Sequence, residues 1–152
     1  MAGADDFDSK SDPNEAKAAT SSAADGTQLD FDVAFFDSIL KQSPDFVDVL
    51  RCQGELLTRK GCHDRALVID RRLATLLPND CVVRYNLACS LALSGERSEA
   101  VETLNQAIEQ GYDDIEYLVA DHDLDSIREE PGFVALVKKY GGARKKKPRR
   151  KK

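Results

Sequence analysis

The chain has 152 residues, of which 41% are hydrophobic and 32% charged, a length that suits one ordinary domain with a modest core. No apolar stretch approaches the roughly 20 residues that a membrane-spanning helix needs. The first residues, MAGADDFDSK, are acidic where a secretory signal or an organelle-targeting peptide is basic, so we expect a cytoplasmic protein without a transmembrane segment.

Charge is unevenly distributed along the chain. Residues 1–32 carry eight acidic residues and two lysines, for a net charge of −6. Residues 33–143 carry 19 acids and 12 bases, for a net charge of −7, and residues 144–152 carry eight bases and no acid. The formal net charge of −5 therefore averages an acidic body and a strongly basic tail.

The four cysteines, Cys52, Cys62, Cys81 and Cys89, form no CxxC pair. If Cys81 and Cys89 share a helix, eight steps of about 1.5 Å separate them by roughly 12 Å. Two thiolates of one zinc site lie much closer together, since each sulfur sits about 2.3 Å from the metal. We therefore predict reduced, packed thiols and no metal or other cofactor.

Residues 1–29 are rich in Ala, Ser, Asp and Thr, and their large apolar residues are Met1, Phe7 and Leu29. Such a segment buries too little to offset the entropy of ordering, so it is predicted to be a disordered acidic segment. The stretch EAKAAT favours helix, but one or two isolated turns are marginal in water.

From Asp30 onward, apolar residues recur at helical spacing and turn residues separate the runs. The first predicted helix ends at Pro44, the second at Gly61 and the third at Pro78. A fourth follows Asp80, a plausible N-cap, and ends at Gly95. A fifth opens at Arg97 or Ser98 and ends at Gly111. No stretch shows the sustained alternation of a strand, which predicts an all-α fold.

After Gly111 the pattern shortens. Asp113 or Asp114 can cap a short helix, and Leu124 with Ile127 indicates one further turn. Pro131 suits the first turn of a last helix, whose apolar residues are Phe133, Leu136, Val137 and Tyr140.

The chain matches itself at an offset of 34 residues. Small residues recur where two helices approach closely, and Gly recurs at the turn between them. The matching pairs are Gly54 with Ala88, Leu57 with Leu91, Gly61 with Gly95, Ala66 with Ala100, Leu67 with Val101, Leu73 with Ala107 and Ala74 with Ile108, and one period earlier Pro44 with Pro78.

A period of 34 made of two antiparallel helices resembles the tetratricopeptide repeat (TPR) family. The Tyr85-Asn86-Leu87-Ala88 run is similar to the opening of the first helix in that family, and Asp123-Leu124-Asp125 before Pro131-Gly132-Phe133 resembles the degenerate end segment of short bacterial arrays. Three residues depart from the pattern: Gln53 stands where Leu is usual, Asp70 where an apolar or aromatic residue is usual, and Tyr112 where Pro is usual.

The resemblance implies a short α-solenoid over residues 30–142, with full repeats at 47–80 and 81–114 and a capping helix at each end. It also implies an inner wall, made by the first helix of each unit, that binds peptides. Thr58 is expected beside this wall. We define the inner wall as the ten residues expected to form it: Asp48, Arg51, Glu55, Arg59, Val82, Tyr85, Asn86, Cys89, Ala92 and Leu93.

Two alternatives for the apolar half of the inner wall remain open. Exposed contiguous apolar residues usually mark a binding site. The last helix of a short stack can equally fold across Tyr85 and Leu93 and bury them.

Enzyme chemistry has little support in the sequence. His63 and His122 are the only histidines, and neither stands in a metalloprotease, phosphate-loop or nucleophile-elbow pattern. Asp121-His122-Asp123 has metal-binding residue types, but consecutive side chains on a helix point apart. We therefore predict no catalytic site.

The tail after Gly142 is predicted to be disordered over residues 143–152. Its bases could bind RNA, DNA, a ribosome or an anionic surface through phosphate charge, without sequence specificity because no aromatic residue is present to stack on bases. In a eukaryote it would also be typical of a nuclear address. These bases are Arg144, Lys145, Lys146, Lys147, Arg149, Arg150, Lys151 and Lys152.

From the sequence we therefore expect a non-catalytic adaptor that binds a protein or peptide of unknown identity on the inner wall. The alternative is a factor associated with nucleic acid or the ribosome through the basic tail.

Overall fold

A computed structural model describes the backbone of residues 13–142 and the side chains of residues 26–142. This part of the chain folds into seven α-helices and one short 3-10 helix, with no strand. The elements are α1 (Pro13–Gln42), α2 (Val47–Arg59), α3 (His63–Leu76), α4 (Cys81–Leu93), α5 (Arg97–Glu109), α6 (Ile115–Ala120), η1 (His122–Ile127) and α7 (Pro131–Gly141).

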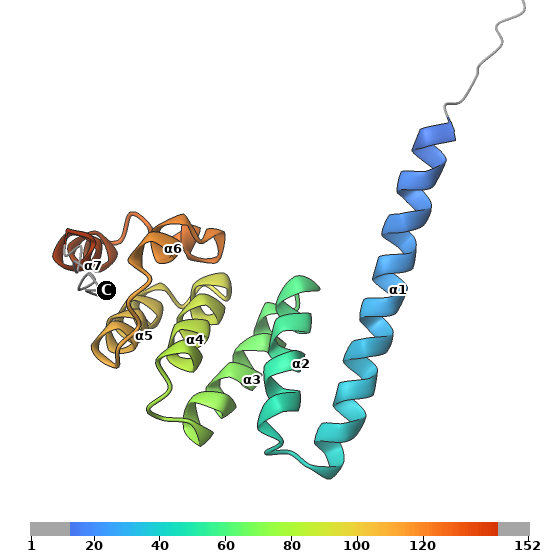
Figure 1. Cartoon of the computed structure of the whole chain (residues 1–152), viewed down its shortest axis with the longest axis horizontal. Helices are drawn as coiled ribbons and strands as arrows, with labels where there is room; N and C mark the ends of the chain where they lie inside the picture. The colour runs from blue at the N-terminus through green and yellow to red at the C-terminus, as the bar shows by residue number, and fades with distance from the viewer. Residues whose placement is uncertain (1–12, 143–152) are drawn as a thin grey trace, which may run out of the picture.

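The helices form a row in which each of the first four packs against the next in sequence (Figure 1). Helices α2 and α3 make one hairpin and α4 and α5 make the next. Helix α1 stands at one end of the row, and α6 and α7 close the other end (Figure 1). The predicted all-α stack of helical hairpins is confirmed.

The helix ends follow the signals seen in the sequence. The Asp80 carboxylate accepts hydrogen bonds from the backbone N–H groups of Val82 and Val83, both at 3.0 Å, and so caps α4. Gly61 and Gly95 have φ of 76° and 85°, a left-handed conformation that residues with a Cβ rarely adopt. The two equivalent turns of the 34-residue repeat therefore share one backbone geometry.

Helix α1 begins at Pro13, within the segment predicted to be disordered, and not near Asp30. Pro is well suited to the first turn of a helix, and the following Asn-Glu-Ala-Lys-Ala-Ala stretch has mostly good helix formers. The prediction of disorder assumes that residues 1–29 would have to nucleate a helix on their own. A helix that is already anchored at residues 30–42 can extend toward Pro13 without a second nucleation step. Residues 1–12, and the basic tail predicted at 143–152, lie outside the described residues.

The main core lies between α3, α4, α5 and the C-terminal elements. Leu91, Leu104, Leu118, Leu124 and Ile127 are fully buried there. Burying each such side chain contributes about 1.5–3 kcal/mol. A smaller cluster of Val33, Leu57 and Ala66 joins α1, α2 and α3.

Gln53, which departs from the repeat pattern, is buried between α1 and α2. Its amide nitrogen donates to the Asp37 carboxylate at 2.6 Å and to the Val33 carbonyl at 3.3 Å. The Arg65 guanidinium also donates to Asp37, at 2.8 and 3.0 Å. A polar residue replaces the usual Leu here because it anchors α1 to the stack.

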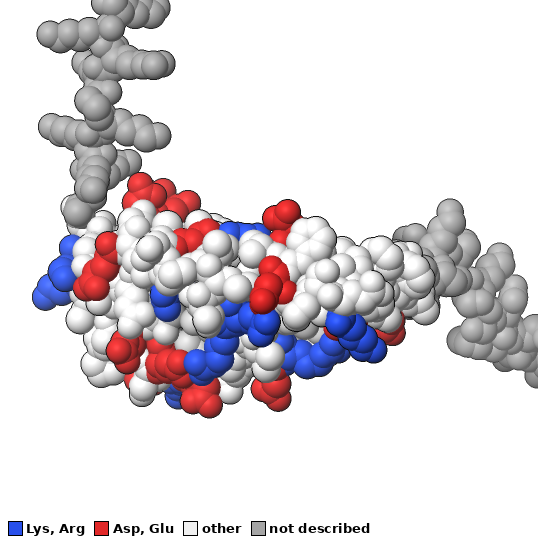
Figure 2. All heavy atoms as spheres, turned by 90° about the horizontal axis from the view of Figure 1, so that it is seen from below, with Lys and Arg blue, Asp and Glu red and all other residues white. Residues whose placement is uncertain are grey.

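Charged side chains of both signs are interleaved over the face shown in Figure 2. Several form ion pairs between helices, such as Arg71 with Glu99 at 2.7 Å. Exposed pairs of this kind contribute at most about 1 kcal/mol each. None of the helices in the described part combines the length and the apolar character needed to span a bilayer.

Candidate functional site

A hollow of about 500 Å³ opens on the inner side of the stack, between α2 and α4. We call it the inner hollow. Residues of both hairpins line it, and α6 and η1 close one end. The lining residues are Arg51, Cys52, Gly54, Glu55, Thr58 and Arg59 from α2, Asp70 and Leu73 from α3, Tyr85, Asn86, Cys89, Ser90 and Leu93 from α4, and Tyr117, Asp121 and Asp123 beyond α5.

Seven of the ten predicted inner-wall residues line this hollow: Arg51, Glu55, Arg59, Tyr85, Asn86, Cys89 and Leu93. The other three do not. Asp48 and Val82 are exposed near the N-terminal ends of α2 and α4, and Ala92 is buried with only 2% of its surface exposed. The seven lining residues lie on α2 and α4, the two helices from which the wall was expected.

Tyr85 is buried against the segment that follows α5. Its ring stacks on Tyr112, with centroids 4.2 Å apart and an interplanar angle of 2°, and its hydroxyl donates to the Asp121 carboxylate at 2.5 Å. Only 4% of the Tyr85 surface stays exposed. Burial raises the pKa of the Tyr85 hydroxyl, and it raises that of Tyr112 to about 12.

Ala92 is covered in the same way, because the Ser126 hydroxyl donates to its carbonyl at 2.8 Å. The last helix, α7, packs instead against α5 and α6. The open question about the apolar half of the wall thus has a specific answer. Residues 112–126 cover Tyr85 and Ala92, whereas Leu93 stays half-buried and lines the inner hollow.

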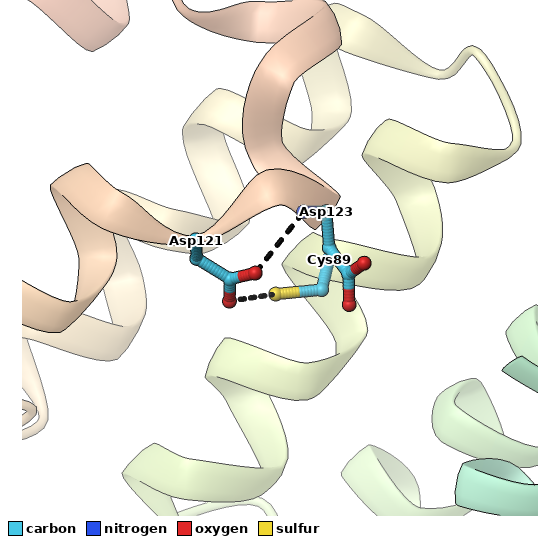
Figure 3. A group of neighbouring side chains, drawn as sticks. All are labelled: Cys89, Asp121 and Asp123. Atoms are coloured by element: carbon cyan, nitrogen blue, oxygen red, sulfur yellow. Dashed lines mark hydrogen bonds between the residues drawn. The ribbon is translucent and has the colours of Figure 1, made fainter. Parts of the chain in front are cut away.

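Cys89, Asp121 and Asp123 converge at one end of the inner hollow, as Figure 3 shows, with one potential ligand atom from each lying within 4.8 Å of the others. The Cys89 thiol donates weakly to Asp121 at 3.8 Å, and the backbone N–H of Asp123 donates to the same carboxylate at 3.0 Å (Figure 3). Burial and the nearby Asp121 raise the pKa of the thiol, which disfavours the thiolate that binds metals. The cluster is a hydrogen-bonded junction that ties η1 to α4.

Asp121, His122 and Asp123 were expected to point apart, and of the three only His122 points away from the others. The His122 side chain is 93% exposed and lies 3.2 Å from Asp125. Asp121 has extended backbone angles, φ −70° and ψ 117°, because it caps η1 and is not inside a helix. As the N-cap, Asp121 turns its carboxylate back to accept from the backbone N–H of Asp123 at 3.0 Å, and this brings Asp121 and Asp123 together.

Asp70, the second departure from the repeat pattern, is buried beside the hollow. It accepts a hydrogen bond from the Ser90 hydroxyl at 2.5 Å, which joins α3 to α4. Burial raises the pKa of the Asp70 carboxyl, and the Ser90 hydrogen bond opposes that rise only in part. An acid whose pKa is raised by folding stabilises the fold when protonated, and this contribution is lost as the pH rises through the folded pKa.

We therefore expect Asp70→Asn to stabilise the protein at pH 7 by about 1–2 kcal/mol, because it removes a buried charge and keeps an acceptor for Ser90. The gain should shrink as the pH falls toward 3.8, the ordinary value for this carboxyl, where wild-type Asp70 becomes protonated. Urea unfolding followed by circular dichroism between pH 3.5 and pH 7 measures this difference. A constant difference across that range, or a loss of stability at pH 7, contradicts the assignment.

The charged residues of the inner hollow are not all available to a ligand. Arg51 donates to Asp80 at 2.8 Å and so holds α2 against the N-terminus of α4. Glu55 and Arg59 are exposed. Asp123 is a second carboxylate beside that of Asp121. Burial and this neighbour raise the pKa of Asp123. Carboxylates therefore outnumber free guanidinium groups in the hollow.

Several lining residues were not predicted from the sequence. Tyr117 is the most exposed aromatic among them, with 56% of its surface open. It lies beside Tyr85, with ring centroids 6.2 Å apart. Tyr117 lies on α6, which begins after Asp114, a cap that the sequence did indicate. The contact of Tyr117 with Tyr85 of α4 is tertiary and has no local signal in the sequence.

Comparison with known proteins gives one family. A family model described as A/B hydrolase-like, N-terminal domain matches residues 56–147, more than half of the chain. The matched segment begins near the C-terminal end of α2 and includes the rest of the described stack. No curated protein matches the chain.

Proposed function

The chain belongs to the A/B hydrolase-like, N-terminal domain family, and we propose that it is a non-catalytic interaction module that binds a peptide or partner helix in the inner hollow. We also propose that its two hairpins are repeats of the tetratricopeptide type. The 34-residue offset and the equivalent glycine turns at Gly61 and Gly95 support this assignment.

The observation that carries the proposal is the inner hollow itself. At about 500 Å³ it is large enough for several side chains of a bound segment. Its floor is rigid, because Tyr85 and Cys89 are held by the contacts to Asp121. A preorganised floor lowers the ordering cost of binding.

The accessible surface of the hollow combines an aromatic ring, an amide and carboxylates. Tyr117 offers an apolar face, Asn86 can pair with a peptide backbone, and Glu55 and Asp123 carry negative charge. We therefore infer a segment with an apolar residue and a Lys or Arg as the ligand. A cationic side chain would complement the local excess of carboxylates.

The polar groups of the described residues also support a non-catalytic role. The Ser90 hydroxyl is hydrogen-bonded to Asp70, and neither histidine donates to or accepts from a Ser or Cys side chain in this part of the chain. A Ser–His or Cys–His pair is what activates a nucleophile in hydrolases. Burial further raises the pKa of the Cys89 thiol.

We place the module in the cytoplasm. All four cysteines are free, and Cys52 is exposed. Unpaired thiols are typical of reducing compartments.

Selection of short random peptides on the immobilised full chain, followed by fluorescence polarisation, tests the proposed function. We expect selected peptides to contain a basic and an apolar residue. Tyr117→Ala should weaken them about tenfold or more, as truncation of an aromatic anchor does. Phe46→Ala is the matched control, because Phe46 is exposed to a similar extent, 48% against 56%, but does not line the hollow.

Charge reversal provides the second arm of this experiment. Glu55→Lys should weaken the same peptides, whereas Glu129→Lys, which changes an exposed acid outside the hollow, should not. Failure to select any peptide, or equal effects of the two members of each pair, contradicts the proposed site.

A further inference from the structure

Helix α1 carries an aromatic stripe on the face turned away from the stack. Phe31 and Phe35 are 65% and 52% exposed, and their rings stack with centroids 6.4 Å apart. Ile39 follows one turn later on the same face and is half-buried. We call these three residues the outer stripe.

The opposite face of α1 already has its partners. Val33 packs with Leu57 and Ala66, and Asp37 accepts hydrogen bonds from Gln53 and Arg65. Helix α1 therefore has two apolar faces, which a helix needs when it lies between two neighbours and not at the end of a stack. A terminal helix of a solenoid ordinarily presents a polar outer face.

The 34-residue repeat indicates what kind of neighbour the outer stripe accepts. At this offset Phe35 and Phe36 correspond to Ile69 and Asp70 of α3. Ile69 and Asp70 face α2, since a Cβ on Gly54 would lie 3.4 Å from the Ile69 Cγ2 and 3.1 Å from the Asp70 Oδ1. The stripe thus lies where α1 would hold the antiparallel first helix of its own hairpin.

We propose that a second copy of this chain supplies that antiparallel helix, through a two-fold pairing of α1 with α1 centred on Phe35. A two-fold axis perpendicular to a helix makes the helix and its copy antiparallel, which is the arrangement in every hairpin of the stack. The opposite end of the row is closed by α7, so this contact joins two copies end to end and stops there (Figure 1).

The spacing of the outer stripe fits this symmetry. Phe31 and Ile39 lie four residues before and four after Phe35, so each meets the other across the axis while Phe35 meets its own copy. In this register Asp32, the charged residue beside the stripe, lies opposite Ser38 of the second copy and not opposite another carboxylate. The pairing therefore buries the aromatic rings without bringing like charges together.

The pairing is expected to be weak, because the exposed parts of two Phe rings of about 200 Å² each give only roughly 400–500 Å² of apolar surface for the pair. Analytical ultracentrifugation of the full chain, from about 10 to about 500 µM, should show a monomer–dimer equilibrium. Phe31→Glu with Phe35→Glu should leave a helical monomer throughout. Val68→Glu, at an exposed apolar residue of α3, is the matched control and should dimerise like wild type.

A charge-pairing experiment tests the register. Phe35→Glu and Phe35→Lys should each be monomeric alone, because like charges meet at the axis, and an equimolar mixture should form heterodimers. A wild-type chain that sediments as a monomer at every concentration overturns the proposal, as does dimerisation that survives the double Glu variant. A mixture that stays monomeric overturns the register centred on Phe35. None of these outcomes depends on the inner hollow, since none of the substituted residues lines it.

Discussion

Tyr85→Ala is expected to lower the free energy of unfolding by about 3–5 kcal/mol, the usual cost of removing a large buried aromatic side chain. The loss combines a cavity under residues 112–126, the stacking contact with Tyr112 and the hydrogen bond to Asp121. Because this ring joins α4 to the C-terminal elements, α6 and η1 should lose their packing first. Urea unfolding followed by circular dichroism measures the change in free energy.

Tyr85→Phe separates the hydroxyl from the ring. It keeps the stacking and removes only one hydrogen bond to a charged acceptor, so we expect a smaller loss of about 1–3 kcal/mol. Hydrogen exchange should show that the backbone amides of α6 and η1 lose protection in the Ala variant before those of α2 and α3. If Tyr85→Ala is as stable as wild type, the burial of Tyr85 by this segment is wrong.

Gly54→Leu is expected to destabilise the protein by about 3 kcal/mol, because α2 and α3 approach too closely at this residue for a large side chain. A Cβ at Gly54 would already lie 3.1 Å from the Asp70 carboxylate and 3.4 Å from Ile69. The remaining atoms of Leu would force α2 away from α3 or displace Asp70 from its hydrogen bond to Ser90. Thermal and urea unfolding measure the loss.

Gly54→Ala is the matched control. Ala88 occupies the equivalent position of the next hairpin and is fully buried, so a methyl group fits this type of helix contact. The gain in helix propensity, about 1 kcal/mol, should offset the tight contact with Asp70 and leave the stability within about 1 kcal/mol of wild type. Equal stability of the Leu variant and wild type would contradict the close approach.

The positions of most helices could be predicted because their ends carry local signals. Asp80 caps α4 through its own side chain, and Gly95 ends the helix with a backbone conformation that few other residues adopt. Pro131 marks the start of α7 in the same way. Such signals depend on a few neighbouring residues, so they are visible in the sequence.

The start of α1 at Pro13 was not predicted, because the composition of residues 1–29 indicates only what an isolated segment would do. Composition alone argues against a helix that must nucleate by itself. A helix that continues from residues 30–42, which are held by Val33 and Asp37, does not pay that cost again. The anchoring contacts are tertiary, so composition could not reveal the extension.

The all-α class, the order of the helices and the two helices from which the inner wall is expected could be read from the sequence, because period, caps and glycine turns are local. Which wall residues remain accessible depends on the tertiary packing. Tyr85 and Ala92 are covered by residues 112–126, while Asn86 and Glu55 stay exposed, and Tyr117, Asp121 and Asp123 join the hollow. Exposure depends on which distant segment packs against a helix face, and no residue of α4 specifies that segment locally.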